Sequence, residues 1–438
     1  MQMYQNTSFT ALCKHYIAPS VVSAVFFSVY AIIDGIIVGS YLGSESLAAM
    51  GLVMPFMFIS FALADMIAIG SSVQISLRLG RGKAQKACEI FSACVLAIVL
   101  ISYCLGLALY IGMEFLLDFM SVSESIKDLC VEYLEVIAIF MPIISLSYAL
   151  DNYLRICQKG VYVMWVGVFV VLCNVALVCL FVIVLELEIF GVALAMCLGL
   201  SLGTILSLMP FFTQDLVLKF CYPKMKLKKF LTVLYNGSSE FMDTASGSLF
   251  AIFANATLLK LSGALGVAVY AAILYIDGLV VSVIMAANGS LQPLLSYFFA
   301  KRDRVQIKHI LRILITINVA FSLFVLAILG IFRADFAGFF AKQNNAEFIA
   351  FMSLALLLYS FGYIAMWFNA LTNGVLTAFD KPTLSMLISL STNLIAPLAF
   401  LMILPRFWGV EGVFIVHFFA EICVLIVSVI LLKKALQL

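Results

Sequence analysis

Acidic side chains lie inside long apolar stretches of this sequence, where a charge has little water to stabilise it. Asp34 occurs in VYAIIDGIIVGSYLG, and Glu240 and Asp243 occur in NGSSEFMDTASGSLFAIFAN. Burial away from opposite charge disfavours a carboxylate anion, so Asp34 is expected to take up and release a proton near physiological pH. Glu240 and Asp243 are three residues apart and share a helix face. Two carboxylates in a low dielectric resist double ionisation, so at least one of them is expected to hold a proton or a cation.

Other polar residues in the apolar stretches are candidates for the same interior. Asn174 needs hydrogen-bond partners and is expected to face the same interior as Asp34. Pro19 lacks a backbone N–H and predicts a hinge, through which protonation of Asp34 would change the shape of its helix. A structural hydrogen bond is the alternative role for each, and Asp151 has Arg155 four residues on as an ion-pair partner. The remaining candidates for lining the interior are Glu421 with His417 one turn before it, Asp277 and Asn255.

The stretches that carry these residues are long enough to cross a membrane. Of 438 residues, 65% are hydrophobic and 11% are charged, whereas a soluble domain has roughly 25% charged residues. A helix needs about 20 apolar residues to span a bilayer. The chain is therefore predicted to be an all-α integral membrane protein with twelve transmembrane helices. The predicted spans are 12–40, 47–76, 88–113, 129–153, 161–185, 189–212, 229–259, 265–298, 307–332, 347–378, 383–404 and 409–432.

The basic residues predict the orientation of these spans. With twelve spans, 20 of the 25 Lys and Arg residues fall on one side of the membrane and 5 on the other. Lys and Arg concentrate in cytoplasmic connections. Both termini are therefore expected to be cytoplasmic.

The chain is predicted to consist of two similar lobes around a central cavity. The N-lobe would be 1–212 with spans one to six, followed by a cytoplasmic linker over 213–228 and a C-lobe over 229–438. A shift of 218 residues aligns Ser72 with Ser290 and Gln74 with Gln292, and a shift of 221 aligns ALDN with ALTN (370–373). Each half has an even number of spans, which is typical of parallel repeats in transporters. This arrangement favours a carrier with alternating access over a channel.

The sequence lacks the motifs of nucleotide-driven and metal-dependent proteins. It has no GxxxxGK[ST] motif, and LGRGK (79–83) is interpreted as a helix end followed by a basic turn. The eleven cysteines include no CxxC pair and are expected to be free, the three histidines lie far apart, and the net charge of +2 implies no acidic partner. We expect no enzyme activity, no cofactor and no nucleic-acid partner. A transient Na⁺ at Asp34, or at Glu240 and Asp243, is the one metal ion that these residues could bind.

Four segments resemble the multidrug and toxic compound extrusion (MATE) family. They are IIDGIIVGSYLGSESLAAMGLVMPF (32–56), AIGSSVQISLRLGRGKAQKA (68–87), LDNYLRICQKG (150–160) and APLAFLMILPRFWGVEGV (396–413). The resemblance extends over nearly the whole chain. It implies secondary export of amphipathic or cationic compounds in exchange for H⁺ or Na⁺, by a monomer in the inner membrane of a bacterium.

The resemblance also implies roles for individual residues. The family's first-span aspartate corresponds to Asp34, its first-span proline to Pro19, and a seventh-span glutamate to Glu240. A fourth-span element corresponds to Asn152, Arg155 and a displaced Gly160. The ion-coupling set is therefore expected to be Asp34, Glu240, Asp243, Asn174 and Asn152.

Three positions depart from the family pattern. Val178 occupies the place of an acid one turn after Asn174, and Met196 the place of a sixth-span threonine. Neither side chain supplies an oxygen for a hard cation such as Na⁺. The tenth-span aspartate has no counterpart, and Asn373 is one of two asparagines found there instead. These departures favour proton coupling, or coupling through Glu240 and Asp243.

A flippase for a lipid-linked or phospholipid substrate is the alternative function. Such a protein needs cationic side chains in its cavity to hold phosphate groups, and the intramembrane charges here are acidic. A membrane enzyme and a scaffold without transport are further alternatives. No nucleophile–base or metal constellation supports the enzyme, and the number of acids within the spans speaks against the scaffold.

Overall fold

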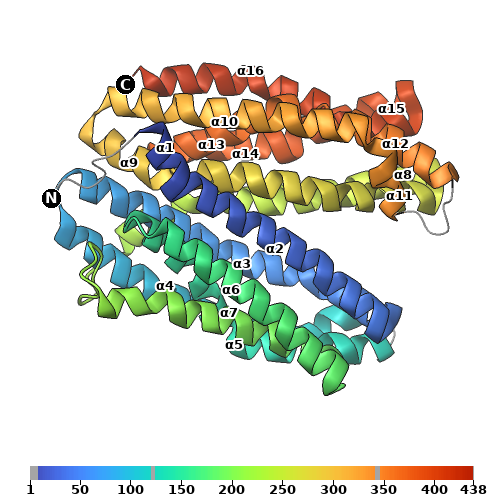
Figure 1. Ribbon diagram of the computed structural model, residues 1–438, viewed down its shortest axis with the longest axis horizontal. Helices are drawn as coiled ribbons and strands as arrows, with labels where there is room; N and C mark the ends of the chain where they lie inside the picture. Colours follow the sequence, from blue (N-terminus) through green and yellow to red (C-terminus); the bar gives the residue numbers. More distant parts are fainter. Residues whose placement is uncertain (1–7, 120–123, 341–345, 438) are drawn as a thin grey trace. The chain divides into compact units, whose positions relative to one another are not determined.

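The computed structural model describes residues 8–119, 124–340 and 346–437, and over these ranges it contains helices and no β-strand (Figure 1). In lipid a helix satisfies its own backbone hydrogen bonds, which an open strand cannot do. Eleven helices of this described part are long and apolar enough to cross a membrane. A bent pair, Ala346–Ser360 with Tyr363–Ala378, forms a twelfth when it is counted as one span. The all-α membrane fold is thus confirmed, and the predicted number of spans is reached with the bent pair.

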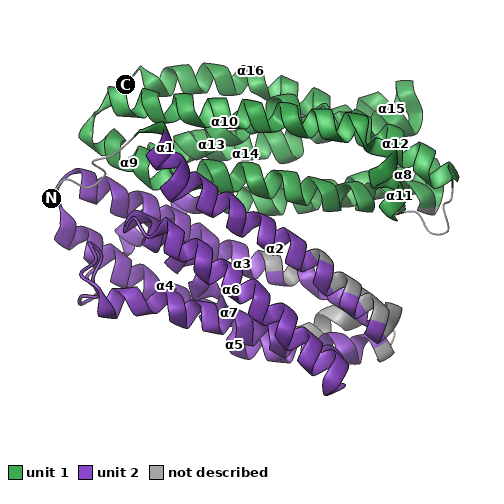
Figure 2. Cartoon of the chain, in the orientation of Figure 1, with its two compact units in different colours: residues 1–9, 238–438 green, residues 10–237 purple. Residues whose placement is uncertain are grey.

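The chain divides into two compact units (Figure 2). Unit 2 is Thr10–Gly237, and unit 1 comprises Met1–Phe9 and Ser238–Leu438. The division falls inside helix α8 (Leu227–Ser290), whereas the sequence predicts a second lobe that begins at residue 229.

Unit 2 extends beyond the sixth span because the segment after it packs back on this unit. The backbone N–H of Cys221 donates to Ser92 Oγ at 2.9 Å. The ring of Phe220 lies 4.8 Å from that of Phe91 and stacks on Phe212 at 5.2 Å. The predicted linker is therefore a packed part of unit 2.

Unit 2 is built around α5 (Glu124–Ile156), which carries the fourth span. This helix packs against α3 (Gly43–Gly80), α4 (Ala84–Phe119) and α7 (Glu188–Thr213). The helix α6 (Gly160–Val178) packs between α2 (Ala18–Ile37) and α7. The short first helix of the chain is α1 (Phe9–Leu12).

Unit 1 is built around α13 (Tyr363–Ala378), the second half of the bent pair. This helix packs against α9 (Gln292–Lys301), α10 (Arg304–Ile331), α14 (Pro382–Leu390) and α16 (Val416–Leu436). Unit 1 also contains α8 from Ser238 onward, α11 (Arg333–Phe340), α12 (Ala346–Ser360) and α15 (Ala396–Phe414).

Spans at equivalent places in the two halves have equivalent neighbours. The fourth span packs against the second (α3), third (α4) and sixth (α7). The tenth span packs through α13 against the end of the eighth (α9), the ninth (α10) and the twelfth (α16). Each unit thus repeats one packing scheme, as the aligned residues of the two halves predict.

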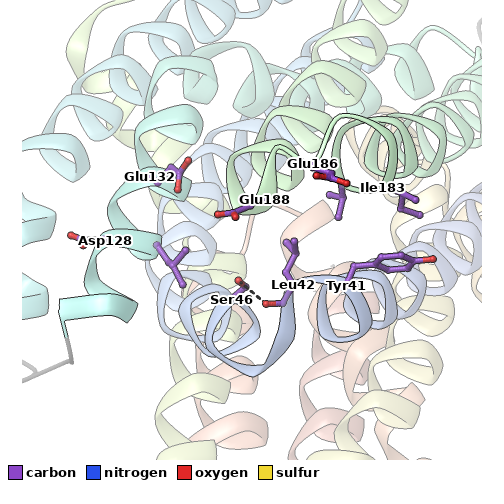
Figure 3. A pocket seen from close by; sticks show the side chains of 10 residues that line it. Tyr41, Leu42, Ser46, Asp128, Glu132, Ile183, Glu186 and Glu188 are labelled. Atoms are coloured by element: carbon purple, nitrogen blue, oxygen red, sulfur yellow. Dashed lines mark hydrogen bonds between the residues drawn. The ribbon is translucent and has the colours of Figure 1, made fainter.

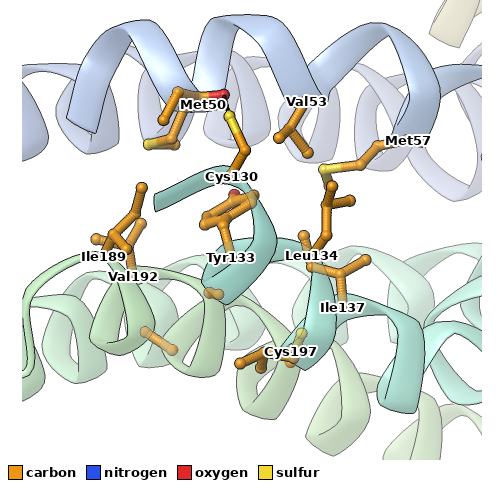
Figure 4. Close-up of a cluster of buried hydrophobic side chains, with 14 of the residues drawn as sticks. Met50, Val53, Met57, Cys130, Tyr133, Leu134, Ile137, Ile189, Val192 and Cys197 are labelled. Carbon is orange, nitrogen blue, oxygen red and sulfur yellow. Dashed lines mark hydrogen bonds between the residues drawn. The ribbon is translucent and has the colours of Figure 1, made fainter. Parts of the chain in front are cut away.

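The core of unit 2 is a cluster of apolar side chains between three helices (Figure 4). Met50 and Val53 of α3, Tyr133 of α5, and Val192 and Cys197 of α7 all belong to it. The described cysteines are all free, as predicted, and Cys197 acts here as a small apolar side chain.

In the part of the chain that the structure describes, four turns are widened to π-helices, a feature that occurs frequently at functional sites. Two of them precede prolines. Ala18 N–H bonds the Cys13 carbonyl before Pro19, and Ala396 N–H bonds the Ser391 carbonyl before Pro397. Helix α2 therefore continues through Pro19, and the irregular turn lies just before it; a hinge at Pro19 stays a prediction. The four segments are η1 (Cys13–Ile17), η2 (Val38–Leu42), η3 (Cys179–Val184) and η5 (Ser391–Ile395).

Glycines make two of the tight connections between spans in unit 1. Gly263, between the seventh and eighth spans, has φ 62° and ψ −151°, and Gly409, near the end of the eleventh, has φ 53° and ψ −132°. A side chain is strained in this left-handed region, which glycine enters freely. Each glycine turns the chain where no longer loop is present.

Candidate functional site

Asp34 lies on α2 in a surrounding without a formal positive charge among the described residues. Its Oδ1 atom is buried and has no hydrogen-bond partner in the part of the chain that the structure describes. Tyr30, one turn earlier, and Tyr133 of α5 interact with it electrostatically. Tyr133 lies in the apolar cluster of Figure 4. A carboxylate so placed gains from binding a proton or a cation.

Asn174 of α6 is another buried polar group of unit 2 without a described partner. The residue is fully buried, and neither amide atom has a hydrogen-bond partner among the described residues. Its side chain lies directly against Gly199 of α7, in the space that a Cβ atom would occupy. Cys197, two residues earlier on α7, lies near Tyr30 and Tyr133, the neighbours of Asp34. Asp34 and Asn174 therefore both lie near the middle of α7.

At the cytoplasmic end predicted for unit 2, charged groups are paired. Arg155 Nη2 lies 2.6 Å from Asp151 Oδ2, which confirms the ion pair predicted for these residues. Arg155 Nη1 donates to Ser20 Oγ at 2.6 Å, so that α5 is tied to α2 beside Pro19. The Asn152 amide donates to a carbonyl of its own helix at 3.2 Å. The structure thus gives Arg155 a structural role and does not bring Asn152 to Asp34 among the described contacts.

Asp243 of α8 is the centre of an amide cluster in unit 1. Asn373 of α13 donates to Asp243 Oδ2 at 3.0 Å, and Asn393 of η5 donates to Asp243 Oδ1 at 2.7 Å. The same Asn373 amide donates to Ser389 Oγ at 3.1 Å. Asp243 is therefore held by groups from two further elements. Both amides are directed to Asp243 and not to the half-buried Glu240 one turn earlier.

Hydroxyl groups extend this cluster along α13 and α14. Ser385 is hydrogen-bonded to Asn373 Oδ1, which fixes the direction of that amide. Thr377 Oγ1 lies 2.6 Å from Ser385 Oγ and 3.2 Å from Ser239 Oγ. The amide that faces Asp243 is thus preorganised by a chain of buried hydroxyl groups.

A second polar cluster of unit 1 lies at α16. Asn369 of α13 donates to Glu421 Oε2 at 2.6 Å, and His417 Nε2 lies 3.8 Å from Glu421 Oε1. Tyr363 donates to Asp277 Oδ1 at 2.9 Å. Glu421 interacts electrostatically with both Asp277 and Asp243, so the two clusters form one acidic region. Asn255 lies twelve residues after Asp243 on α8, about 18 Å along the helix, so it is not brought to Asp243.

The sequence reasoning missed Asn393, although a signal for it is present. A shift of 219 residues, within the range that aligns the two halves, relates Asn174 of the fifth span to Asn393 of the eleventh. Asn393 donates to the acid of the seventh span, Asp243. The repeat would therefore have pointed to it.

An acidic pocket of about 910 Å³ lies at the other end of unit 2, between η2, α5 and the start of α7 (Figure 3). Asp128 and Glu132 of α5 line it together with Glu186 and Glu188. The described lining contains no Lys or Arg. The positive-inside pattern predicts this end to be external, where four carboxylates attract cations.

The fold and these sites define a multi-pass helical membrane protein with acids buried inside each of its two units. The sequence model of the MatE family matches residues 19–180 and 241–401, once in each half. The chain belongs to this family of membrane transporters and is not an enzyme. A search of curated proteins found no match.

Solved structures of transporters share the fold. A crystal structure of MATE in complex with MaL6 superposes with a TM-score of 0.93 at 20% identity, covering 98% of this chain and 96% of that one. A transporter of the MOP superfamily from Pyrococcus furiosus, with a binding pocket described as reversed in polarity, gives 0.92 at 20% identity over 98% and 96%. An aspartate-to-asparagine mutant of the Vibrio cholerae MATE transporter VcmN gives 0.91 at 19% identity over 99% and 98%.

Proposed function

We propose that this transporter exports amphipathic or cationic small molecules in exchange for protons. The observation that carries the proposal is the buried acids of the two units. Asp243, Asp277 and Glu421 face amide, hydroxyl or imidazole groups, and Asp34 Oδ1 is buried without a described partner. Among the described residues none of these acids is paired with Lys or Arg. A buried acid without a cationic partner binds a proton or a cation to offset its charge.

Exchange follows from the limited charge of such an acid. One carboxylate offsets one positive charge, so a proton and a cationic substrate compete for it. If the acid opens alternately to either side of the membrane, entry of the proton drives exit of the substrate. With both termini in the cytoplasm of a bacterial cell, protons would enter the cell as the substrate leaves through the inner membrane.

The surroundings of Asp34 favour H⁺ over Na⁺ in unit 2. Val178 and Met196, which take the places of two oxygen-bearing residues of the family, both pack into the apolar cluster of this unit. Na⁺ is a hard cation and needs several oxygen ligands. A proton needs one acceptor, which Asp34 Oδ1 supplies.

The acidity of both units also supports cationic substrates over the phosphates of a lipid flippase. Phosphate recognition uses Arg and Lys in fixed geometry. Arg155, the largely shielded arginine described above, is already paired with Asp151.

Reconstituted vesicles given a proton gradient or a sodium gradient separately test the proposal. For exchange of one proton per monovalent cation, a gradient of one pH unit is worth about 1.4 kcal/mol and supports up to about tenfold accumulation of an ethidium-like cation. Asp34→Asn should abolish this accumulation. Asp215→Asn, which removes an exposed carboxylate paired with Lys219 outside the spans, should leave it intact. Accumulation that follows sodium alone would contradict proton coupling, and no accumulation across a broad compound panel would contradict export.

A further inference from the structure

His417 lies at the break in the tenth span. Helix α12 ends at Ser360 and α13 begins at Tyr363, and their axes are bent by 45°. The carbonyl of Tyr359 accepts the backbone N–H of Gly362 at 3.0 Å, and His417 Nδ1 lies 3.1 Å from the same carbonyl. The imidazole ring occupies the space that a Cβ atom on Gly362 would need. The ring is thus anchored to the backbone at the bend.

This contact fixes the tautomer of His417. A carbonyl oxygen only accepts hydrogen bonds, so Nδ1 carries the proton that is donated to Tyr359. The ring also stacks on the Tyr359 side chain at 4.2 Å and meets the edge of Tyr363 at 5.5 Å, which holds its orientation. In the neutral ring, Nε2 is consequently an acceptor with a lone pair.

The Nε2 atom faces a second acceptor. It lies 3.8 Å from Glu421 Oε1, one turn further along α16. The other oxygen of the carboxylate accepts from Asn369 at 2.6 Å. Both side chains are largely buried, at 15% exposure for His417 and 5% for Glu421. A lone pair and a carboxylate oxygen that face each other in a buried site repel, and one proton between them removes the repulsion.

Among the described residues, the groups that face this pair are either acidic or uncharged. From α8, Asp277 interacts electrostatically with His417, and both Asp277 and Asp243 interact with Glu421. From α12 and α13 come Tyr359 and Tyr363, and both tyrosines hydrogen-bond to Asp277. On the opposite face of α16, Phe400 and Trp408 of α15 pack against Phe419 and bring no charge to this helix. A proton at the pair therefore has no fixed cation to repel it.

An orphaned acceptor beside the pair also points to a ligand. Asn369 is almost fully buried, and its Oδ1 atom has no hydrogen-bond partner among the described residues, although its Nδ2 atom donates to Glu421. The amide oxygen is thus free to accept from a protonated group at this site.

We propose that His417 and Glu421 form a proton-binding site of unit 1, which holds one exchangeable proton at the break in the tenth span. Its ligand is H⁺ from solvent, which forms either an imidazolium beside a carboxylate or a carboxylic acid beside a neutral imidazole. His417 Nδ1 is hydrogen-bonded at the bend between α12 and α13. When Nε2 moves closer to Glu421, the imidazole ring that anchors this bend is therefore displaced. The site rests on the proposed function and deepens it, since it assigns a proton of unit 1 to one pair of residues.

Histidine-selective ¹⁵N NMR of the full chain in lipid nanodiscs tests the site without transport, so this inference and the proposed export fail separately. The chain has three histidines, and His15→Gln and His309→Gln assign the signal of His417. We expect the Nδ1–H tautomer at alkaline pH and one titration of Nε2 as the pH falls.

Variants at Glu421 separate a shared proton from an isolated histidine. Glu421→Gln should weaken proton binding at His417 by tenfold or more, which moves the titration by at least about one pH unit to lower pH. Glu421→Asp, with the same charge drawn back by one methylene, should give a smaller shift and serves if the Gln variant does not fold. Glu411→Gln, at an exposed position of α15, should leave the titration unchanged. A His417 signal that does not change with pH in the unmodified chain, or that titrates identically without Glu421, would overturn the proposal.

Discussion

Asn174 and Asn393 occupy equivalent positions of the two halves but differ in hydrogen bonding, so replacing each by leucine should affect stability differently. Asn393 donates to Asp243 Oδ1 at 2.7 Å. A buried hydrogen bond contributes about 1 kcal/mol, and about 1.5–3 kcal/mol when its partner is charged. Asn393→Leu should therefore lower the free energy of unfolding by about 1–3 kcal/mol, a factor of about 5 to 150 in the folded-to-unfolded ratio.

Asn174 has no such bond to lose. Both of its amide atoms are buried without a partner among the described residues, and an unsatisfied buried amide costs about 1–3 kcal/mol. Leucine removes this cost but has to fit against Gly199, which offsets part of the gain. Asn174→Leu should therefore leave the stability unchanged or raise it by up to about 2 kcal/mol, whereas proton-driven transport should fall.

Denaturant unfolding of the purified variants in one detergent, at one pH and without substrate, measures both effects. Asn152→Leu is the matched control, because that amide bonds a carbonyl of its own helix at 3.2 Å near the surface. It should cost less stability than Asn393→Leu. A loss for Asn174→Leu as large as that for Asn393→Leu would mean that Asn174 has a partner in the folded protein. The expectation that Asn174 contributes to transport rather than to stability would then be wrong.

Two further predictions concern the cytoplasmic end predicted for unit 2. Gly160→Ala would place a Cβ atom 2.5 Å from the His15 carbonyl oxygen, so the start of α6 must move away from η1. This should lower the free energy of unfolding by about 1–3 kcal/mol, measured by thermal unfolding. Gly330→Ala, which has open space around it, should not lower the stability. Arg155→Gln should lower the stability by about 1–2 kcal/mol, because the pair with Asp151 is only partly shielded from solvent, and a loss that persists in high salt would show that packing rather than charge is responsible.

The spans could be predicted closely because the membrane leaves few alternatives. A run of about 20 apolar residues has to be a helix in lipid, and the basic connections mark its ends. The boundary between the units could not be predicted in the same way, because it depends on packing. Phe220 and Cys221 hold the segment after the sixth span on unit 2, and no pattern in that segment announces these contacts.

The site could be predicted in part. Asp34 and Asp243 stand out because acids are rare in apolar spans. Tyr363, which donates to Asp277, was missed because an aromatic residue in a helix reads as core. Glu186 and Glu188 were missed because charged residues at the ends of spans are usually solvated. In the structure both line the acidic pocket, and their backbone has positive φ values of 52° and 49°.

The two units hold their acids in different ways, and this difference bears on coupling. In unit 1, Asp243 is already bonded by two side-chain amides, so a ligand arriving there has to compete with existing hydrogen bonds. In unit 2, Asp34 Oδ1 and the Asn174 amide are buried without described partners. The cost of burying them is offset by the rest of the fold, and a proton that binds Asp34 removes part of this cost. Proton binding should accordingly change the local free energy more at Asp34 than at Asp243. Asp34 is therefore the acid whose loss we expect to uncouple transport most completely.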